Sequence, residues 1–563
     1  MGIVDSLLTR KAALEAQSEP WHNHIRDLAK YVLPTMAQHE ATDIVRAVAG
    51  EPDSAYRSPQ LFDHTAIMAI QRLAAGEISL NMPSASIWHD LRKSDPFADE
   101  PSQAEKEFLE RLRHYLFKMR YNPRTGFSVA SKAAVKSRCA FGTGVIYVCE
   151  QMGAGADVPM SYRYVPILEN NLGANFEGVI DTNFRVFTRT ASQCVEKWGN
   201  QCSAKVRKDA DNPGQANRAV QLVHAVLPRR EFTDRYGEGF VSFYLEVEAR
   251  HLIREHGYFE FPYIVLHWDR ENQGPYCEGP VSMAISEIKS LQLMSKEEYT
   301  AAQQWINPPT AQKDDDHNRP DLSPGGTNPG MLNERGELLI KPIMLQANPG
   351  FARDIIEAKQ QNLKEALYVN LWQILISNPN MTATEAMIRA QEKGDLLGPS
   401  GLSLQVGLAD MVDREIAILG RKGAFGVGSR LEVPYTMDNQ SIGVGFTGPL
   451  DRMRRLPHLQ GIERAIEMAG KLAEIGDESG IERLDGDRIM AHTQDIGGAP
   501  ADIFKSDAQL AEDRLQKLAS GQQQQLLDNI EKTADAAKAT GEGVMALENA
   551  AAMADAGNHS HNV

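Results

Sequence analysis

The feature that most constrains the fold is residues 281–305, a long stretch without glycine or proline. Gly279-Pro280 precedes it and Asn307-Pro308-Pro309 follows it, so residues that stop a helix stand at both ends. Apolar residues recur within it at helical spacing: Ile285, Ile288, Leu291, Met294, Tyr299, Ala302 and Trp305. Charged residues fall between them: Glu287, Lys289, Lys296, Glu297 and Glu298. The stretch predicts one amphipathic helix of roughly 36 Å. A spacer between two β-rich regions and an ordinary core helix both fit this pattern.

The rest of the chain mixes helical and strand-like patterns, which favours the α+β fold class. Branched and aromatic residues make 220–267 the clearest β module, and 145–190 is also strand-like. Shorter strands are predicted near residues 87–91, 337–345, 431–435 and 442–446. Helices are predicted over 5–32 with a break at Pro20, and over 58–80, 101–119, 127–140, 190–198, 351–376, 402–419 and 449–495.

Three segments lack such a pattern. Residues 204–217 predict a polar connection, and 308–336, rich in Pro, Gly, Asn and Asp, predict a long surface loop. The chain ends in an Ala- and Gln-rich tail, whose last ~15 residues we expect to be disordered.

Charge and cysteine content narrow the function classes. The net charge of −16 argues against broad gripping of a phosphate backbone, since such binding needs concentrated Lys and Arg. The five cysteines form no CxxC pair, so the sequence indicates neither a disulfide framework nor a zinc knuckle, and it favours a reducing compartment. No apolar run reaches the ~20 residues that span a bilayer, and no signal-peptide pattern is present, so we expect no membrane partner.

The common catalytic motifs are missing from the sequence. It contains no GxxxxGK[ST], HExxH or GxSxG. The run Phe141-Gly142-Thr143-Gly144 follows a predicted helix and enters a strand, the reverse of the dinucleotide fingerprint, so it predicts a tight helix-to-strand turn. We therefore expect no enzyme, no catalytic residue, no cofactor and no bound metal, and we favour a structural or assembly role.

One acidic run leaves an alternative open. Asp314-Asp315-Asp316-His317 has ligands suited to Mg²⁺ and phosphodiester cleavage. Its Pro- and Gly-rich surroundings fit a solvated acidic loop better. A metal-dependent phage DNA-processing nuclease that uses residues 314–317 is the alternative function.

Several segments, taken in order, resemble the portal (head-to-tail connecting) proteins of short-tailed, podovirus-like bacteriophages. They are 21–34 (WHNHIRDLAKYVLP), 61–88 (with DHTA and LAAGEISLNMP), 141–145 (FGTGV), 178–199, 256–262 (HGYFEFP), 266–268 (LHW), Gly279-Pro280 with the IKSL helix, and 380–385 (NMTATE). No single motif is diagnostic, and their succession over residues 20–425 carries the resemblance. His267 is a departure, since family members often have arginine before the tryptophan.

The resemblance implies a portal fold, assembled as a ring of twelve subunits at one capsid vertex, through which double-stranded DNA is packaged and later ejected. It implies these regions: N-terminal helices and wing (1–215), β-rich clip (216–280), stem helix (281–306), wing loop and strands with the tunnel loop (307–350), kinked helix and wing (351–448), and helical crown or barrel with a flexible tail (449–563). The net negative charge agrees with a channel along which DNA must slide.

The resemblance also implies roles for individual residues and partners. The candidates for the DNA channel or tunnel are Glu287, Lys289, Lys296, Glu297, Asn348 and Arg353. The candidates for packing between stem helices of neighbouring subunits are Ile285, Ile288 and Met294. The implied partners are other copies of the chain, double-stranded DNA, the terminase large subunit, tail adaptor and nozzle proteins, and the major capsid and scaffolding proteins. The expected location is the virion, after assembly in the host cytoplasm.

Overall fold

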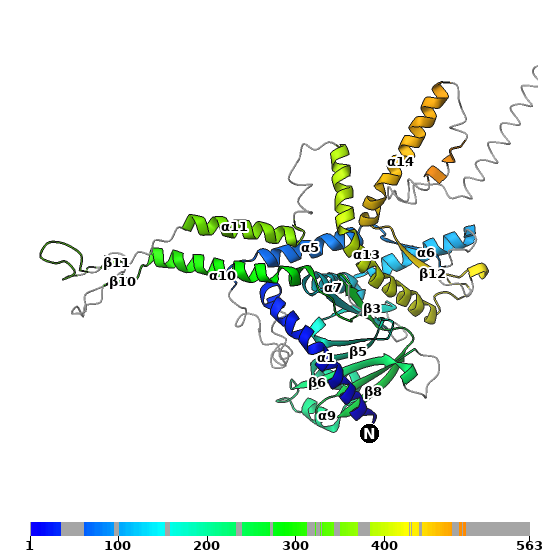
Figure 1. The fold of residues 1–563 in the computed structure, drawn as a ribbon. Helices are drawn as coiled ribbons and strands as arrows, with labels where there is room; N and C mark the ends of the chain where they lie inside the picture. The colour runs from blue at the N-terminus through cyan, green and yellow to red at the C-terminus, as the bar shows by residue number, and fades with distance from the viewer. Residues whose placement is uncertain are drawn as a thin grey trace, which may run out of the picture. The chain divides into compact units, whose positions relative to one another are not determined.

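The computed structural model describes residues 2–34, 61–94, 101–151, 158–231, 239–270, 274–311, 321, 327, 329–339, 341–342, 349–369, 383–426, 428–429, 431–437, 442–475, 483–486 and 488–490. The chain divides into two compact units, Met1–Gly461 and Ile462–Val563. The first unit mixes helices and antiparallel sheets, so the α+β class is confirmed (Figure 1). No helix within the described ranges is long and apolar enough to span a membrane.

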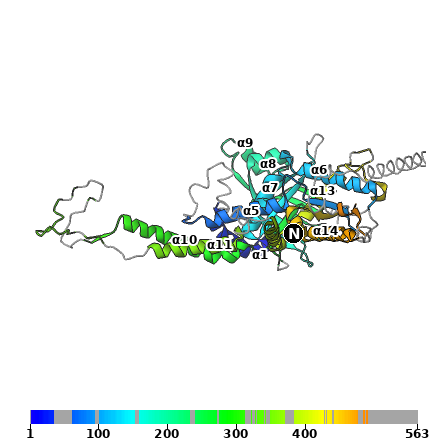
Figure 2. The same ribbon diagram turned by 90° about the horizontal axis from the view of Figure 1, so that it is seen from above.

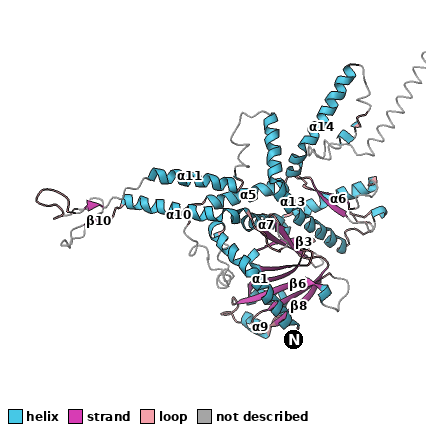
Figure 3. Cartoon of the chain, viewed as in Figure 1, coloured by secondary structure: helices cyan, strands magenta, loops and turns pink. Residues whose placement is uncertain are grey.

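Two antiparallel sheets form the β part of the first unit (Figure 3). The smaller has the order β3-β2-β9: β3 (Met160–Val165), β2 (Thr143–Glu150) and β9 (Tyr263–His267). The larger has the order β4-β5-β6-β7-β8: β4 (Asn170–Ala174), β5 (Ile180–Thr190), β6 (Ala219–Pro228), β7 (Phe240–Glu246) and β8 (His251–Tyr258).

The predicted β module at 220–267 is therefore not a separate module, because its strands belong to both sheets. Its first strand, β6, pairs with β5 from Thr190↔Ala219 to Asn183↔Val226, so the larger sheet crosses the boundary predicted between residues 215 and 216. Its last strand, β9, pairs with β2 in the other sheet. β-Propensity indicates that a strand forms, but it carries no information about the strand's partner.

Helices cover these sheets. α1 (Ile3–Val32) contributes Leu7 to a cluster with Val223 and Phe243 of the larger sheet, and α7 (Phe127–Phe141) packs on β2. Because β6 is covered on both faces, its sequence reads as a nearly continuous apolar run. α8 (Ala191–Trp198) begins with a capping box in which Thr190 and Gln193 bond each other's backbone, and it packs on the same sheet through Cys194 and Trp198.

The turn from α7 to β2 confirms the tight helix-to-strand turn expected at residues 141–144. Gly142 ends α7 with φ +79°, in the left-handed region, and its carbonyl accepts a hydrogen bond from the Trp268 N–H at 2.8 Å. A Cβ on Gly142 would lie 2.1 Å from the Cys277 carbonyl oxygen, and a Cβ on Gly144 would lie 2.1 Å from that of Ala134. Glycine is needed at both positions because the backbone of another segment lies too close to leave room for a Cβ.

The predicted break at Pro20 is wrong, because α1 runs through it as one helix. Contacts on both sides of Pro20 hold the helix. Ser18 accepts a hydrogen bond from the Tyr276 hydroxyl at 3.2 Å, and His22 Nε2 donates to the Asn170 carbonyl at 3.1 Å. These tertiary contacts offset the hydrogen bond that proline removes.

Four further predictions need correction. The polar connection at 204–217 contains a helix, α9 (Ala204–Asp211), which Ser203 caps by accepting from the Val206 N–H. Residues 431–435 form no strand, because Pro434 lacks the N–H that a sheet needs.

The limits of two helices also differ from the prediction. α11 (Pro349–Ala366) ends before the predicted residue 376, since Tyr368 adopts φ +60°, which cannot continue a helix. The helix predicted over 402–419 is only the second part of α13 (Ala383–Arg421), which runs through Pro399. Figure 1 shows that α13 is bent.

Distant parts of the chain meet in a small third sheet. β1 (His89–Lys93) pairs antiparallel with β12 (Ile442–Phe446), from His89↔Phe446 to Lys93↔Ile442. The strands predicted near 87–91 and 442–446 are thus confirmed as elements. Trp88, which is fully buried, stacks on Phe446 with ring centroids 6.3 Å apart. α5 (Thr65–Asn81) and α6 (Gln103–Arg120) flank this part of the core.

Two buried ion pairs cross the core. Arg120 of α6 and Glu415 of α13 are both 0% exposed, with Nη2 and Oε2 2.5 Å apart, and the Tyr162 hydroxyl donates to Glu415 Oε1 at 2.5 Å. Burial raises the pKa of Tyr162 well above its usual range, so the phenol stays protonated and able to donate. Arg138 of α7 pairs with Glu77 of α5 and donates to the Ser400 carbonyl at 2.6 Å. Each pair joins helices that are far apart in sequence.

We expect the protein to lose stability as the pH falls from 6.5 towards 4. Burial lowers the pKa of His267 from 6.5 to about 4 and also lowers the pKa values of His22, His89 and His224. In that range the unfolded chain binds protons that the folded chain does not, so protonation favours unfolding. For His267 alone the loss reaches about 3 kcal/mol at pH 4.

Urea unfolding of the wild type and of His267→Gln at several pH values measures this effect. Glutamine retains a donor for the Pro275 carbonyl, which His267 Nε2 meets at 3.2 Å. The variant should therefore fold and show a shallower loss of stability between pH 6.5 and 4. Identical pH profiles for the two proteins would contradict the assignment to His267.

Candidate functional site: the arm formed by α10 and α11

Two long antiparallel helices lie side by side and form what we call the arm: α10 (Pro280–Ile306) and α11 (Figures 1 and 2). α10 confirms the helix predicted over 281–305. Gly279 is its N-cap in extended conformation and Pro280 occupies its first turn, where the missing N–H is harmless. Asn307 ends it before two prolines. In the chain segment that connects α10 to α11, β10 (Thr310–Ala311) pairs with β11 (Lys341–Pro342).

The first half of α10 is part of the core. Val281, Ile288 and Leu291 are at most 1% exposed and share a cluster with Ile356 and Leu363 of α11. The Gln292 side chain accepts from the Phe62 N–H at 2.9 Å and donates to the Asp63 carbonyl at 2.5 Å. This half is thus fixed to α7, to α11 and to the residues just before α5.

The second half of α10 keeps large apolar side chains in solvent. Leu293, Tyr299 and Trp305 are 55–57% exposed, and Ile306 is 86% exposed. Among them Tyr299 and Ile306 are seven residues apart and therefore lie on the same side of the helix. The core-helix and spacer interpretations therefore each describe one half of α10.

The expected subunit-packing residues lie mainly within the chain's own core. Ile288 is 1% exposed, and Ile285 and Met294 are partly buried against the same cluster. Burial within its own chain leaves Ile288 no exposed surface to offer a neighbouring copy.

Two of the expected channel residues form ion pairs inside the chain. Glu287 Oε1 lies 3.0 Å from Lys359 Nζ of α11. Lys289 Nζ lies 2.7 Å from Asp27 Oδ2 of α1, and this hydrogen bond raises the pKa of Lys289. These pairs attach α10 to its neighbouring helices.

The remaining channel candidates are exposed or undescribed. Lys296 and Glu297 are exposed on the second half of α10, and among the described residues neither side chain has a partner. Arg353, 73% exposed, lies 3.6 Å from Glu357 one turn along α11. Asn348 lies outside the described residues, as do Asp314-Asp315-Asp316-His317 of the nuclease alternative.

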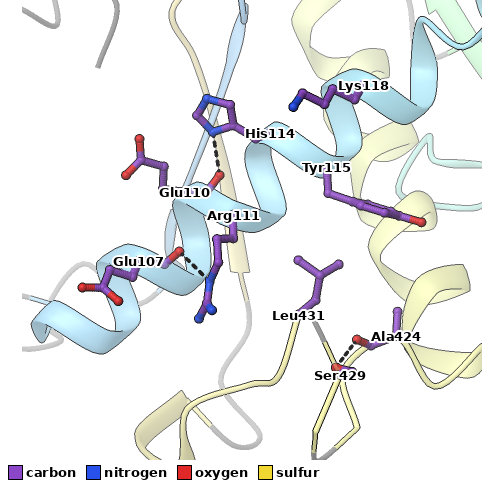
Figure 4. Close-up of a pocket in the computed structure, with 9 residues that line it drawn as sticks. All are labelled: Glu107, Glu110, Arg111, His114, Tyr115, Lys118, Ala424, Ser429 and Leu431. Atoms are coloured by element: carbon purple, nitrogen blue, oxygen red, sulfur yellow. Dashed lines mark hydrogen bonds between the residues drawn. The ribbon is translucent and has the colours of Figure 1, made fainter. Parts of the chain in front are cut away.

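A cavity of about 720 Å³, absent from our sequence-based expectations, opens beside α6 (Figure 4). Its polar side chains bond backbone of their own segments: Arg111 Nε donates to the Glu107 carbonyl at 3.3 Å, and Ser429 Oγ to the Ala424 carbonyl at 2.7 Å. These contacts bring no nucleophile and base together.

Metal and thiol chemistry find no support in the described part of the chain. It holds no group of three or more His, Cys, Asp or Glu side chains placed to bind a metal ion. All five cysteines are free, and burial raises the pKa of Cys194 to about 12 and those of Cys202 and Cys277 to about 11. Such thiols are protonated and unreactive at neutral pH.

One solved structure matches the chain loosely. A chain described as "Virion of native gene transfer agent (GTA) particle" aligns with 82% of this chain and 99% of its own length at 14% identity, with a TM-score of 0.31. A superposition this loose carries no argument about the fold.

Sequence comparisons are more informative. A "Probable portal protein" of Bordetella phage BPP-1 is 25% identical over 557 residues, covering 97% of this chain and 96% of the relative. A "Portal protein" of Salmonella phage epsilon15 is 24% identical over 555 residues, covering 96% and 95% respectively. The sequence model of the family described as "Bacteriophage head to tail connecting protein" matches residues 4–504. By this match over most of its length, the chain belongs to the family of bacteriophage head-to-tail connecting proteins.

Proposed function

We propose that the chain is a portal protein, which forms a ring at one vertex of the capsid and lets double-stranded DNA enter during packaging and leave at ejection. The observation that carries the proposal is the alignment of two phage portal proteins with nearly the whole chain, together with the family match over residues 4–504. Neither relative is named as a nuclease. We therefore propose a non-enzymatic role within the virion.

The arm is the proposed stem, and its exposed apolar residues are the proposed contact between subunits. Ring closure needs a head-to-tail interface, in which two different surfaces of each copy meet. Tyr299 and Ile306, seven residues apart on one side of α10, provide one such surface, with the exposed Trp305 beside Ile306 in the same last turn. Of the packing candidates that the resemblance implied, Ile288 is buried within the subunit, whereas Ile285 and Met294 are partly buried and stay candidates for this contact.

We propose a different place for the clip from the one the resemblance implied. Residues 216–280 contribute strands to both sheets of the body, so they are not a separate module. The pair β10–β11 joins the far ends of the two arm helices. This position suits the surface that docks the terminase large subunit and later the tail adaptor. Residues 1–280 and 383–448 then form the wing, next to capsid and scaffolding proteins, and the chain from 449 forms the crown.

DNA contact is proposed for exposed residues of the arm. Lys296, Glu297 and Arg353 keep their charges in solvent, and Asn348 precedes α11 directly. Sparse cations in a chain of net charge −16 give weak attraction along the phosphate backbone, so the duplex slides while the closed ring retains it. A ring of twelve copies is proposed from the resemblance.

Negative-stain electron microscopy of the purified protein tests the portal role. We expect rings with a central hole about as wide as a DNA duplex. Subunits that stay monomeric or dimeric at every concentration and ionic strength would contradict the proposal, because a portal acts only as a closed ring.

The variant Trp305→Asp tests the proposed contact between subunits. A charge on this apolar surface opposes its burial, so we expect the protein concentration needed for half assembly to rise at least roughly tenfold, with unchanged unfolding of the single subunit. Gln304→Asp adds the same charge to the neighbouring exposed position and serves as the control. Analytical ultracentrifugation measures both; equal assembly of the two variants would exclude Trp305 from the interface.

The variant Lys296→Glu tests the proposed DNA contact. We expect normal rings and less DNA packaged into procapsids, since the change reverses an exposed charge without altering a contact among the described residues. Packaging at the wild-type level would remove Lys296 from the channel surface.

A further inference from the structure

A second cavity, of about 540 Å³, lies where the two sheets face each other. Tyr147 of β2 and Arg163 of β3 line it from the smaller sheet. Tyr244 of β7 and Arg254 of β8 line it from the larger sheet, and α8 contributes Lys197. This volume falls within the range of sites that bind small organic molecules, about 300–1,000 Å³.

Cations gather in this cavity without matching anions. Among the residues that the structure describes, Arg163, Lys197 and Arg254 contact no carboxylate. The one acidic side chain of the lining, Glu150, already lies 3.4 Å from Arg421, which also binds Glu260 at 2.6 Å. The cavity is therefore positively charged, although the whole chain carries a net charge of −16.

These cations repel one another. The pKa of Lys197 is lowered by its partial burial first, and then by the charge of Arg163 and those of Arg189 and Arg185. Arg163, Lys197 and Arg254 are exposed to solvent, so an anion can reach them, and an anion bound among them would relieve the repulsion. A cluster of unpaired cations thus points to an anionic ligand.

Aromatic rings form the rest of the wall. Lys197 Nζ lies 4.7 Å from the centroid of the Trp198 ring and 5.2 Å from that of Tyr244. Phe259 at the mouth is 49% exposed, with the Arg421 guanidinium 4.9 Å from its ring centroid. Rings beside unpaired cations suit a ligand that has both a flat aromatic part and an anionic part.

We propose that this cavity binds a nucleoside phosphate, with the phosphate among Arg163, Lys197 and Arg254 and the base against the exposed ring of Phe259. Nucleoside phosphates combine the two chemistries that the wall provides.

Isothermal titration calorimetry of the full-length protein with AMP tests the proposal, with adenosine and inorganic phosphate as separate ligands. We expect AMP to bind and each of the other two to bind at least tenfold more weakly. Lys197→Gln and Arg254→Gln should each weaken AMP binding at least tenfold, while Lys197→Arg stays within about threefold of the wild type. Lys208→Gln, an exposed change on α9 outside the cavity, should leave binding unchanged.

Thermal unfolding without ligand shows whether each variant folds. No measurable AMP binding to the wild type, or equal AMP affinity in Lys197→Gln, Arg254→Gln and wild type, would overturn the proposal. Phosphate that binds as tightly as AMP would overturn the nucleoside assignment. The titrations are run on assembled and unassembled fractions, and AMP binding confined to unassembled subunits would mean that a neighbouring copy fills the cavity, which also overturns it.

Discussion

Glu415→Ala is expected to lower the free energy of unfolding by roughly 3–5 kcal/mol, as measured by urea denaturation of the single subunit. The change leaves Arg120 as an uncompensated charge that is 0% exposed, and it removes the acceptor of the Tyr162 hydroxyl. Arg120 also lies over the Trp88 ring, 4.8 Å from its centroid, so it cannot turn to solvent without disturbing the core.

Two further variants separate the contribution of the ion pair to stability from that of lost packing. Glu110→Ala removes an exposed carboxylate 3.6 Å from Arg113 and should change stability by less than about 1 kcal/mol. The double variant Arg120→Met with Glu415→Leu removes both buried charges and should recover much of the loss. A double variant less stable than Glu415→Ala would indicate that Arg120 is held chiefly by Trp88 and its other neighbours.

Gly142→Ala is the second change with a large expected effect. Its φ of +79° strains any residue with a Cβ, and the new atom would lie 2.1 Å from the Cys277 carbonyl oxygen. Because that neighbour is backbone, the segment before α10 must move, and we expect a loss of roughly 3–5 kcal/mol or a failure to yield soluble protein.

Gly199→Ala provides a matched control for strain without a clash. Gly199 has φ +53°, but a Cβ there would meet no atom within 4 Å. We expect a loss of roughly 1–3 kcal/mol, from backbone strain alone, because its ψ of −122° also lies outside the left-handed helical region. Thermal unfolding compares the two variants, and similar losses would mean that the approach of Cys277 to Gly142 contributes little.

Local signals predicted the elements whose boundaries the chain itself encodes. The limits of α10 follow from Gly279-Pro280 at its start and from Asn307 and the two prolines after it, which are local stop signals. The turn at Gly142 was predictable for the same reason. In contrast, Pro20 is a strong local break that tertiary contacts at Ser18 and His22 override.

Pairing over long separations could not be predicted from one sequence. The apolar stripe of α10 does not show that Ile288 is covered by its own chain while Trp305 remains exposed. Likewise the sequence does not show that Lys289 pairs with Asp27, which is 262 residues away. The cavity between the sheets was missed because its cations come from separate elements with no common motif.

The pairing of β1 with β12 sets the order of events during synthesis. At about 5–20 residues per second, a ribosome that has made β1 needs roughly 20–70 s more to reach β12. Glu415, the partner of Arg120, also emerges late. Until then the N-terminal half exposes an unpaired strand edge and an uncompensated arginine, and both invite premature association. Completion of this sheet and of the buried ion pair therefore waits for residue 446, so a chain cut short before β12 cannot complete the core.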